Sequence, residues 1–139
     1  MSAVSTQALS LTTVRGALAA ALAPRTDADP GVLPDLVDAI DPPVLLLEWR
    51  DPWLEPRTVG VGYFDALLAV LAIAGRLEPG PGIETLEALV GYTLGRLLAD
   101  GHSWPVESLT APRRFDMGGI PYLGARIVLR VPVSIETED

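Results

Sequence analysis

The chain of 139 residues has no cysteine, no lysine, and one histidine, His102. The absence of cysteine excludes disulfides, thiolate nucleophiles and zinc sites with cysteine ligands. All 10 basic residues are arginines, and 18 acidic residues give a formal net charge of −8. Because binding to phosphate groups requires a local surplus of cations, this charge balance disfavours DNA, RNA and anionic membranes as ligands.

Long apolar segments are also missing. The longest run covers residues 66–75 and is too short to span a bilayer. Residues 1–5 do not combine a basic region with an apolar core, so we expect no signal peptide. With 49% hydrophobic residues, the composition is typical of a globular protein, and we expect one domain over residues 1–139 that is made in a cytoplasm.

Apolar residues at helical spacing predict two main helices. The first lies within residues 1–24, with Leu11, Val14, Leu18 and Leu22 on its apolar face. The second follows the Pro- and Gly-rich residues 78–82, and its predicted apolar positions are Ile83, Leu86, Val90, Leu94 and Leu97. Gly91 and Gly95 lie four residues apart in this helix, and we expect the protein's own sheet, rather than a neighbouring subunit, to pack closely against them.

Four strands are predicted around these helices. Residues 44–50 and 63–77 read as strands, although the Leu and Ala content of the second also favours helix. Residues 104–115 and 120–133 read as a hairpin with its turn at 116–119. We therefore expect an α+β fold with a mostly antiparallel four-stranded sheet and two main helices, in the order α-β-β-α-β-β. An acidic loop (25–42) precedes the core (43–133), and an acidic tail (134–139) follows it.

No pattern of catalytic or ligand-binding residues emerges. The sequence predicts His102 in a surface turn, without a nucleophile or acid placed to act with it. The segment Gly80-Pro81-Gly82 resembles a dinucleotide-binding turn but lacks the third glycine. Asp27, Asp29 and Asp38 resemble part of a calcium loop without its required glycine. We expect no catalytic, cofactor or metal site, and no enzyme activity.

The best candidates for contact with a partner lie on the C-terminal hairpin. Arg113-Arg114 is the only cationic pair in the sequence. It could reach a phosphate group, but a salt bridge to an acidic neighbouring subunit fits an acidic protein better. On the return arm, the arginines alternate with the predicted core residues and should face away from the core. The predicted interface residues are Arg113, Arg114, Phe115, Asp116, Met117, Arg126 and Arg130.

Several segments in this order resemble a known family. They are Trp49-Arg50, Arg76-Leu77-Glu78-Pro79-Gly80, Leu86-Glu87-Ala88-Leu89-Val90, the pair Gly101 and Trp104, and Gly118-Gly119-Ile120-Pro121-Tyr122-Leu123-Gly124-Ala125. Their order and spacing over residues 42–133 are similar to those of the tail terminator proteins of long-tailed bacteriophages (siphoviruses), especially phages of actinobacteria.

The resemblance implies a structural protein of the virion, located at the neck of the tail and made in the host cytoplasm. Such a subunit forms a hexameric ring that caps the tail tube, stops its polymerisation and joins the tail to the head-completion (stopper) protein. DNA would pass through the lumen without specific binding. Two other functions stay open: another neck or head–tail connector protein, and a small bacterial ligand-binding or dimerisation module.

Overall fold

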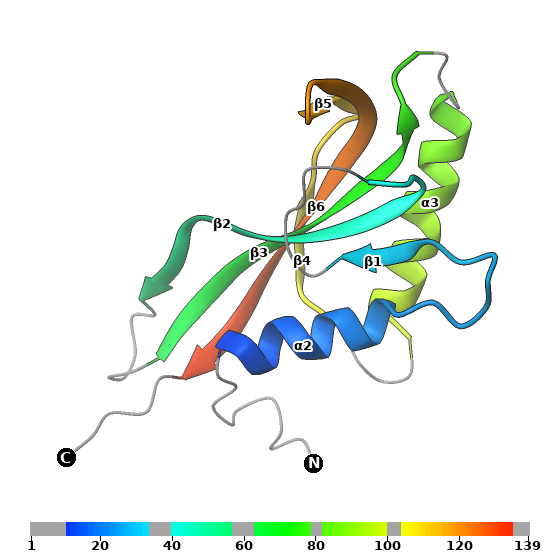
Figure 1. The fold of residues 1–139 in the computed structure, drawn as a ribbon. Helices are drawn as coiled ribbons and strands as arrows, with labels where there is room; N and C mark the ends of the chain where they lie inside the picture. Colours follow the sequence, from blue (N-terminus) through cyan, green and yellow to red (C-terminus); the bar gives the residue numbers. More distant parts are fainter. Residues whose placement is uncertain (1–10, 34–39, 57–62, 79–81, 100–103, 135–139) are drawn as a thin grey trace.

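The computed structural model describes residues 11–33, 40–56, 63–78, 82–99 and 104–134. A six-stranded sheet forms its centre, with strand order β1-β2-β3-β6-β4 and with β5 also paired to β6 (Figure 1). In chain order the elements are α2 (Leu11–Leu22), β1 (Gly31–Leu33), β2 (Val44–Pro56), β3 (Tyr63–Arg76), α3 (Ile83–Leu97), β4 (Val106–Leu109), β5 (Arg113–Met117) and β6 (Ile120–Ser134).

The long strands β3 and β6 form the middle of the sheet. They pair antiparallel from Tyr63 opposite Ser134 to Arg76 opposite Tyr122. Strand β2 pairs antiparallel with the other side of β3, and the short β1 adds to β2 in parallel. Strands β4 and β5 both pair antiparallel with β6, so they lie one after the other along the edge opposite β1.

Both helices pack on the same face of the sheet. Val14, Leu18 and Leu22 of α2 are fully buried, and they share one core cluster with α3 and with alternate residues of the central strands. From α3 the buried residues are Leu86, Leu89, Thr93 and Leu97. The buried hydroxyl of Thr93 donates a hydrogen bond to the Leu89 carbonyl oxygen at 2.8 Å, which satisfies it inside its own helix.

The opposite face, here called the open face, is not covered by either described helix. One end carries a small apolar cluster of Val44, Leu46, Leu71, Ile73 and Tyr122, and residues of β5 pack against it. The rest of this face carries charged side chains from β2, β3, β4 and β6. The sheet therefore has one face that builds the core and one whose surface is largely polar.

The predicted four-stranded, mostly antiparallel sheet in the order α-β-β-α-β-β is wrong. The sheet is a mixed one with six strands, and the order of the described elements is α-β-β-β-α-β-β-β. Strand β1 lies inside the segment 25–42 that we expected to be a loop. With three residues after Pro30, it is too short to show alternation, and only its parallel pairing with β2 reveals it.

The predicted arm 104–115 is two strands instead of one. Residues 110–112 separate β4 from β5, and Pro112 has no N–H to donate to a continuous ladder. Strand β2 also continues to Pro56, six residues beyond the predicted strand 44–50. It does so because the register between β2 and β3 shifts between Trp49 and Leu54, which lets the extra residues leave the ladder before pairing resumes.

Other expectations are confirmed. Residues 63–76 form a strand, and nine consecutive residues of it (Ala66–Ala74) are buried, as in a strand covered on both sides. The hairpin turn has Gly118 and Gly119, both with positive φ, which suits a two-residue turn between antiparallel strands. The expectation for Gly91 and Gly95 is wrong: both are exposed, and no described residue lies within 4 Å of where a Cβ would be.

The acidic tail from 135 onwards, residues 1–10 and the segment 34–39 lie outside the described residues. Among the helices that are described, none is both long enough and apolar enough to span a membrane.

Candidate functional site

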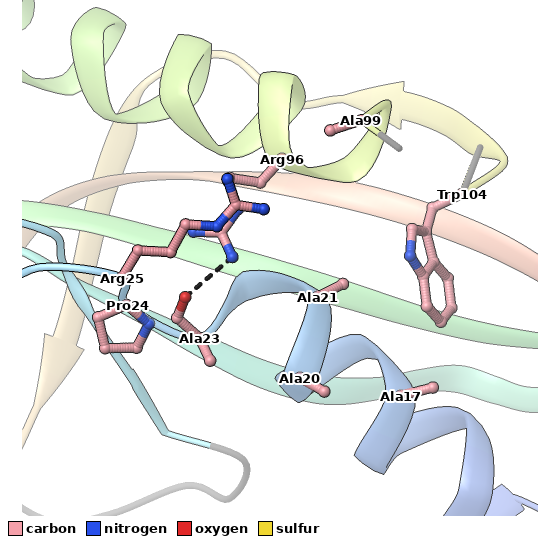
Figure 2. Close-up of a pocket in the computed structure, with 9 residues that line it drawn as sticks. All are labelled: Ala17, Ala20, Ala21, Ala23, Pro24, Arg25, Arg96, Ala99 and Trp104. Atoms are coloured by element: carbon pink, nitrogen blue, oxygen red, sulfur yellow. Dashed lines mark hydrogen bonds between the residues drawn. The ribbon is translucent and has the colours of Figure 1, made fainter. Parts of the chain in front are cut away.

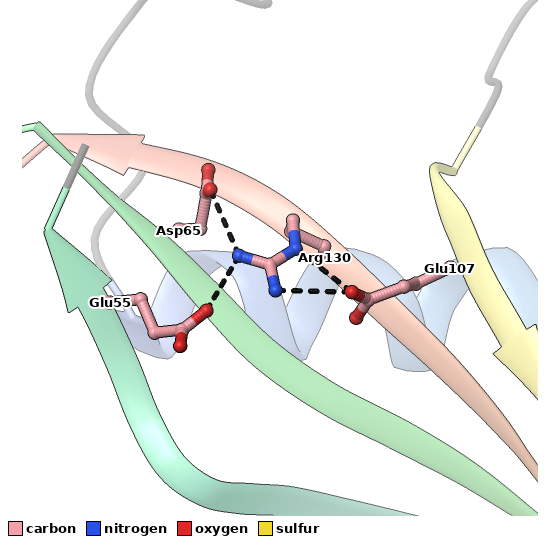
Figure 3. Close-up of polar contacts among 4 residues, drawn as sticks. All are labelled: Glu55, Asp65, Glu107 and Arg130. Atoms are coloured by element: carbon pink, nitrogen blue, oxygen red, sulfur yellow. Dashed lines mark hydrogen bonds and ion pairs between the residues drawn. The ribbon is translucent and has the colours of Figure 1, made fainter. Parts of the chain in front are cut away.

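Arg130 is at the centre of an ion-pair cluster on the open face (Figure 3). Its guanidinium donates to Glu55 at 2.7 Å, to Asp65 at 3.2 Å and to Glu107 at 3.1 Å. These acids come from β2, β3 and β4, while Arg130 comes from β6. One side chain therefore links four neighbouring strands, and the four groups were not joined by any pattern in the sequence.

The hydrogen bonds from Arg130 to Glu55, Glu107 and Asp65 raise the pKa of its guanidinium above the ordinary value. One positive charge faces three carboxylates in this cluster. The cluster thus keeps a surplus of negative charge, and Arg130 is committed to partners inside its own chain.

We predict that Arg130→Met lowers the midpoint of thermal unfolding. The variant leaves three carboxylates close together without their counter-ion, so they repel one another. The loss should be larger at low than at high salt, since salt screens charges at a partly exposed site. Arg113→Met is the matched control, because the Arg113 side chain is exposed and has no polar partner among the described residues. Equal midpoints for the two variants would contradict this role of Arg130.

Arg126 forms a second ion pair on the open face. Its Nε donates to Glu48 of β2 at 2.5 Å, and its guanidinium lies 5.2 Å from the centre of the Phe115 ring. Glu48 is also 4.0 Å from Arg50. Arg126 therefore connects β6 with β2 across β3 and holds the side chain of Phe115 against the sheet.

Strand β5 carries the remaining predicted interface residues. Phe115 and Met117 are partly buried against the small apolar cluster of the open face. Arg113, Arg114 and Asp116 are exposed, and the Arg114 and Asp116 side chains, 61% and 58% accessible, form an ion pair at 2.9 Å. The predicted interface residues thus fall into three groups. Phe115 and Met117 pack against the sheet, Arg126 and Arg130 form ion pairs within the chain, and the other three residues lie on an exposed edge.

Gly124 allows β5 to lie close to the sheet. A Cβ at this position would come within 2.7 Å of the Ala72 carbonyl oxygen and of Ile73 Cδ1, and within 3.1 Å of Phe115. Only glycine leaves room for the side chains of Ile73 and Phe115 to meet above β6. The position of the exposed edge therefore depends on a residue that the sequence alone does not single out.

Acidic side chains gather at the opposite edge of the sheet. Asp27 and Asp29 precede β1, Asp41 precedes β2, and these parallel strands pair Gly31 with Val44, so the three acids lie at the same end. Asp29 accepts hydrogen bonds from the backbone N–H groups of Arg25 and Thr26 at 2.8 and 3.1 Å. The bond from Arg25 is the largest cause of a lowered Asp29 pKa. Asp29 is therefore used to hold a turn.

A pocket of about 540 Å³ opens between the C-terminal ends of α2 and α3 (Figure 2). Arg25 and Arg96 lie side by side at one end, Trp104 lies at the other, and alanines of α2 lie between them. Arg96 donates to the Ala23 carbonyl oxygen at 2.9 Å and to the Tyr92 hydroxyl at 2.7 Å. Its Nε is buried and has no hydrogen-bonding partner among the described residues. The pocket could accept a small anionic group.

The other candidate motifs lie largely outside the described residues. His102, Gly80 and Asp38 lie outside the described residues, and Asp29 is engaged in its turn. Within the described ranges, no three or more His, Cys, Asp or Glu side chains are grouped as a metal ion would require. No protein-family model matches the chain, and a search of curated proteins finds no similar sequence.

Proposed function

We propose that this chain is a structural assembly subunit, the tail terminator of a long-tailed bacteriophage. In this role it forms a ring that caps the tail tube, stops tube polymerisation and presents its other surface to the head-completion protein. It would be part of the virion neck after synthesis in the host cytoplasm. The proposal has two supports: the resemblance over residues 42–133 and the one-sided cover of the sheet.

The one-sided cover carries the structural argument. Both helices pack on one face, which leaves the open face and two sheet edges for contact with neighbours. The charged side chains on the open face are paired with one another across strands. Such a surface suits binding by a rigid body more than turnover of a substrate.

The proposal is tested by mixing the purified chain with growing tail tubes and imaging them by negative stain. We expect capped tubes that stop growing, because a bound ring blocks the end where tube subunits add. The control is an equal amount of an unrelated acidic protein of similar size. Tubes that keep growing, together with binding to the head connector alone, would favour a stopper protein instead.

The pocket beside Arg25 and Arg96 favours a second candidate, a small ligand-binding module. Two arginines at one end and an indole at the other suit a ligand that has an anionic group and an apolar body. Native mass spectrometry of the purified chain separates the two functions. A retained anionic metabolite, with no binding to tail components, would support this module against the terminator.

A further inference from the structure

We propose that copies of this chain join edge to edge, with strand β5 of one copy pairing antiparallel with strand β1 of the next. The inference rests on the proposed ring-forming function and names the surfaces that build the ring. The partner is a second copy of the same chain. Three observations support this contact: the sheet has two free edges, these edges differ in charge, and both lie on the same cross-strand row.

Among the described strands, two parts of the sheet border are suited to accept another strand. Beyond its pairing with β1, the border along β2 is interrupted by the register shift between Trp49 and Leu54 and contains Pro52 and Pro56. Shifts and prolines of this kind block strand addition. Strand β1 pairs on one side only, and so do β4 and β5, among the described residues. The open edges are therefore at opposite ends of the strand order.

Strand β5 presents backbone groups that need a partner. Its two-residue turn makes Met117 and Ile120 a hydrogen-bonded pair, and the alternate pairs Phe115–Tyr122 and Arg113–Gly124 follow the same pattern. The N–H and C=O groups of Arg114 and Asp116 consequently point away from β6. An added strand can satisfy them as an antiparallel neighbour does.

The charges of the two edges are complementary. The basic edge carries Arg113 and Arg114. Arg114 is paired with Asp116 of the same strand, whereas the Arg113 side chain has no polar partner among the described residues. At the other edge, Asp27 and Asp41 are exposed and also lack a partner within the described ranges. Arg25, the cation nearest in sequence, points toward Arg96 in the pocket (Figure 2). Contact between copies would therefore bring the uncompensated charge of Arg113 close to this acidic edge.

The two edges also lie at the same level of the sheet. One cross-strand row runs through Gly31, Val44, Ile73, Gly124 and Arg113. A contact between edges on one row adds little offset along the strands. A heterologous contact without such an offset closes into a ring when its rotation divides a full turn, whereas an offset would build a helical filament. The strand directions agree too, because β5 runs opposite to β1 within this sheet.

Charge reversal tests the contact. We expect R113E/R114E and D27R/D41R each to weaken self-association, measured by sedimentation velocity, by about tenfold or more, because like charges then face each other. An equimolar mixture of the two variants should associate again, since each supplies the edge that the other lacks. The control E84R/E87R makes the same net change as D27R/D41R at exposed positions of α3 and should associate like the parent chain. Unchanged association of both reversed variants would overturn the proposal.

Disulfide cross-linking tests the edge contact even if the purified parent chain is a monomer. The parent has no cysteine, and Gly31 has open space for a Cβ, so G31C/R113C adds the only two thiols. Within one copy they are four strand spacings apart, about 19 Å, beyond the reach of a disulfide. Oxidation at high concentration should give a ladder of cross-linked copies, while either single variant stops at dimers. Monomers alone after oxidation of the double variant would refute the edge contact.

The two proposals fail in different ways. If the ladder forms and the chain does not cap tail tubes, the edge contact stands and the terminator function falls. If capped tubes form with R113E/R114E as readily as with the parent chain, the terminator function stands and the edge contact falls.

Discussion

Replacing Leu129 with alanine should destabilise the protein by about 2–5 kcal/mol, the usual cost of a Leu-to-Ala cavity in a packed core. Leu129 lies in the central strand β6, its accessible surface is 0%, and it belongs to the cluster beneath both helices. Single domains are stable by only about 5–15 kcal/mol, so this loss is a large part of the total. Denaturant unfolding followed by circular dichroism measures it.

Leu98→Ala is the matched control for this prediction. Leu98 follows α3 and is 58% exposed, so the same atoms are removed without leaving a cavity. Its effect should stay within about 0.5 kcal/mol, as for most surface substitutions. A similar loss for both variants would mean that Leu129 is not in the core of the folded chain.

Gly124→Ala should destabilise the protein by about 1–3 kcal/mol, the range for overpacking a tight site. The added methyl group would meet the Ala72 carbonyl oxygen at 2.7 Å, and this backbone atom cannot move without disturbing the pairing of β3 with β6. It would also push on Ile73 and Phe115, which hold β5 against the open face. The measurement is the same unfolding curve, read together with near-ultraviolet circular dichroism as a report on aromatic packing.

The same substitution at Gly91 should have the opposite sign. Gly91 lies inside α3, is exposed and has no described neighbour within 4 Å of a Cβ. Alanine is favoured over glycine in a helix interior by about 1 kcal/mol, so Gly91→Ala should stabilise the chain by that amount. If Gly124→Ala were as stable as the parent, the close approach of β5 to β6 would not exist in solution.

The sequence predicts the long elements of this fold well because their burial has a period. Residues 123–133 alternate between the core and the open face, and the structure places Ile127, Leu129 and Val131 in the core as expected. In α3 the period shifts slightly: Leu89 and Thr93 are buried, whereas Ile83 is 45% exposed. A search for apolar residues misses Thr93 because its side chain is polar. Thr93 can nevertheless be buried, since its hydroxyl donates a hydrogen bond within the helix.

Features that depend on pairing between distant segments could not be predicted. Strand β1 has no periodicity of its own, and β5 is separated from β4 by residues 110–112, which include Pro112. Arg130 and Arg126 alternate visibly with core residues, but nothing in the sequence shows that Glu55, Asp65, Glu107 and Glu48 lie opposite them. Their partners follow from the order of strands in the sheet. Arg126 and Arg130 are thus occupied by partners within the chain. The contact between copies proposed for the hairpin therefore depends on Arg113 and Arg114.

The irregular part of β2 has a consequence for how the chain behaves at high concentration. A long, flat strand at a sheet border invites strands from any protein, and it is a common starting point for aggregation. Between Trp49 and Leu54, this strand leaves the ladder and places Asp51 and Pro52 at the surface. We therefore expect this segment to limit the aggregation of newly made copies before they assemble.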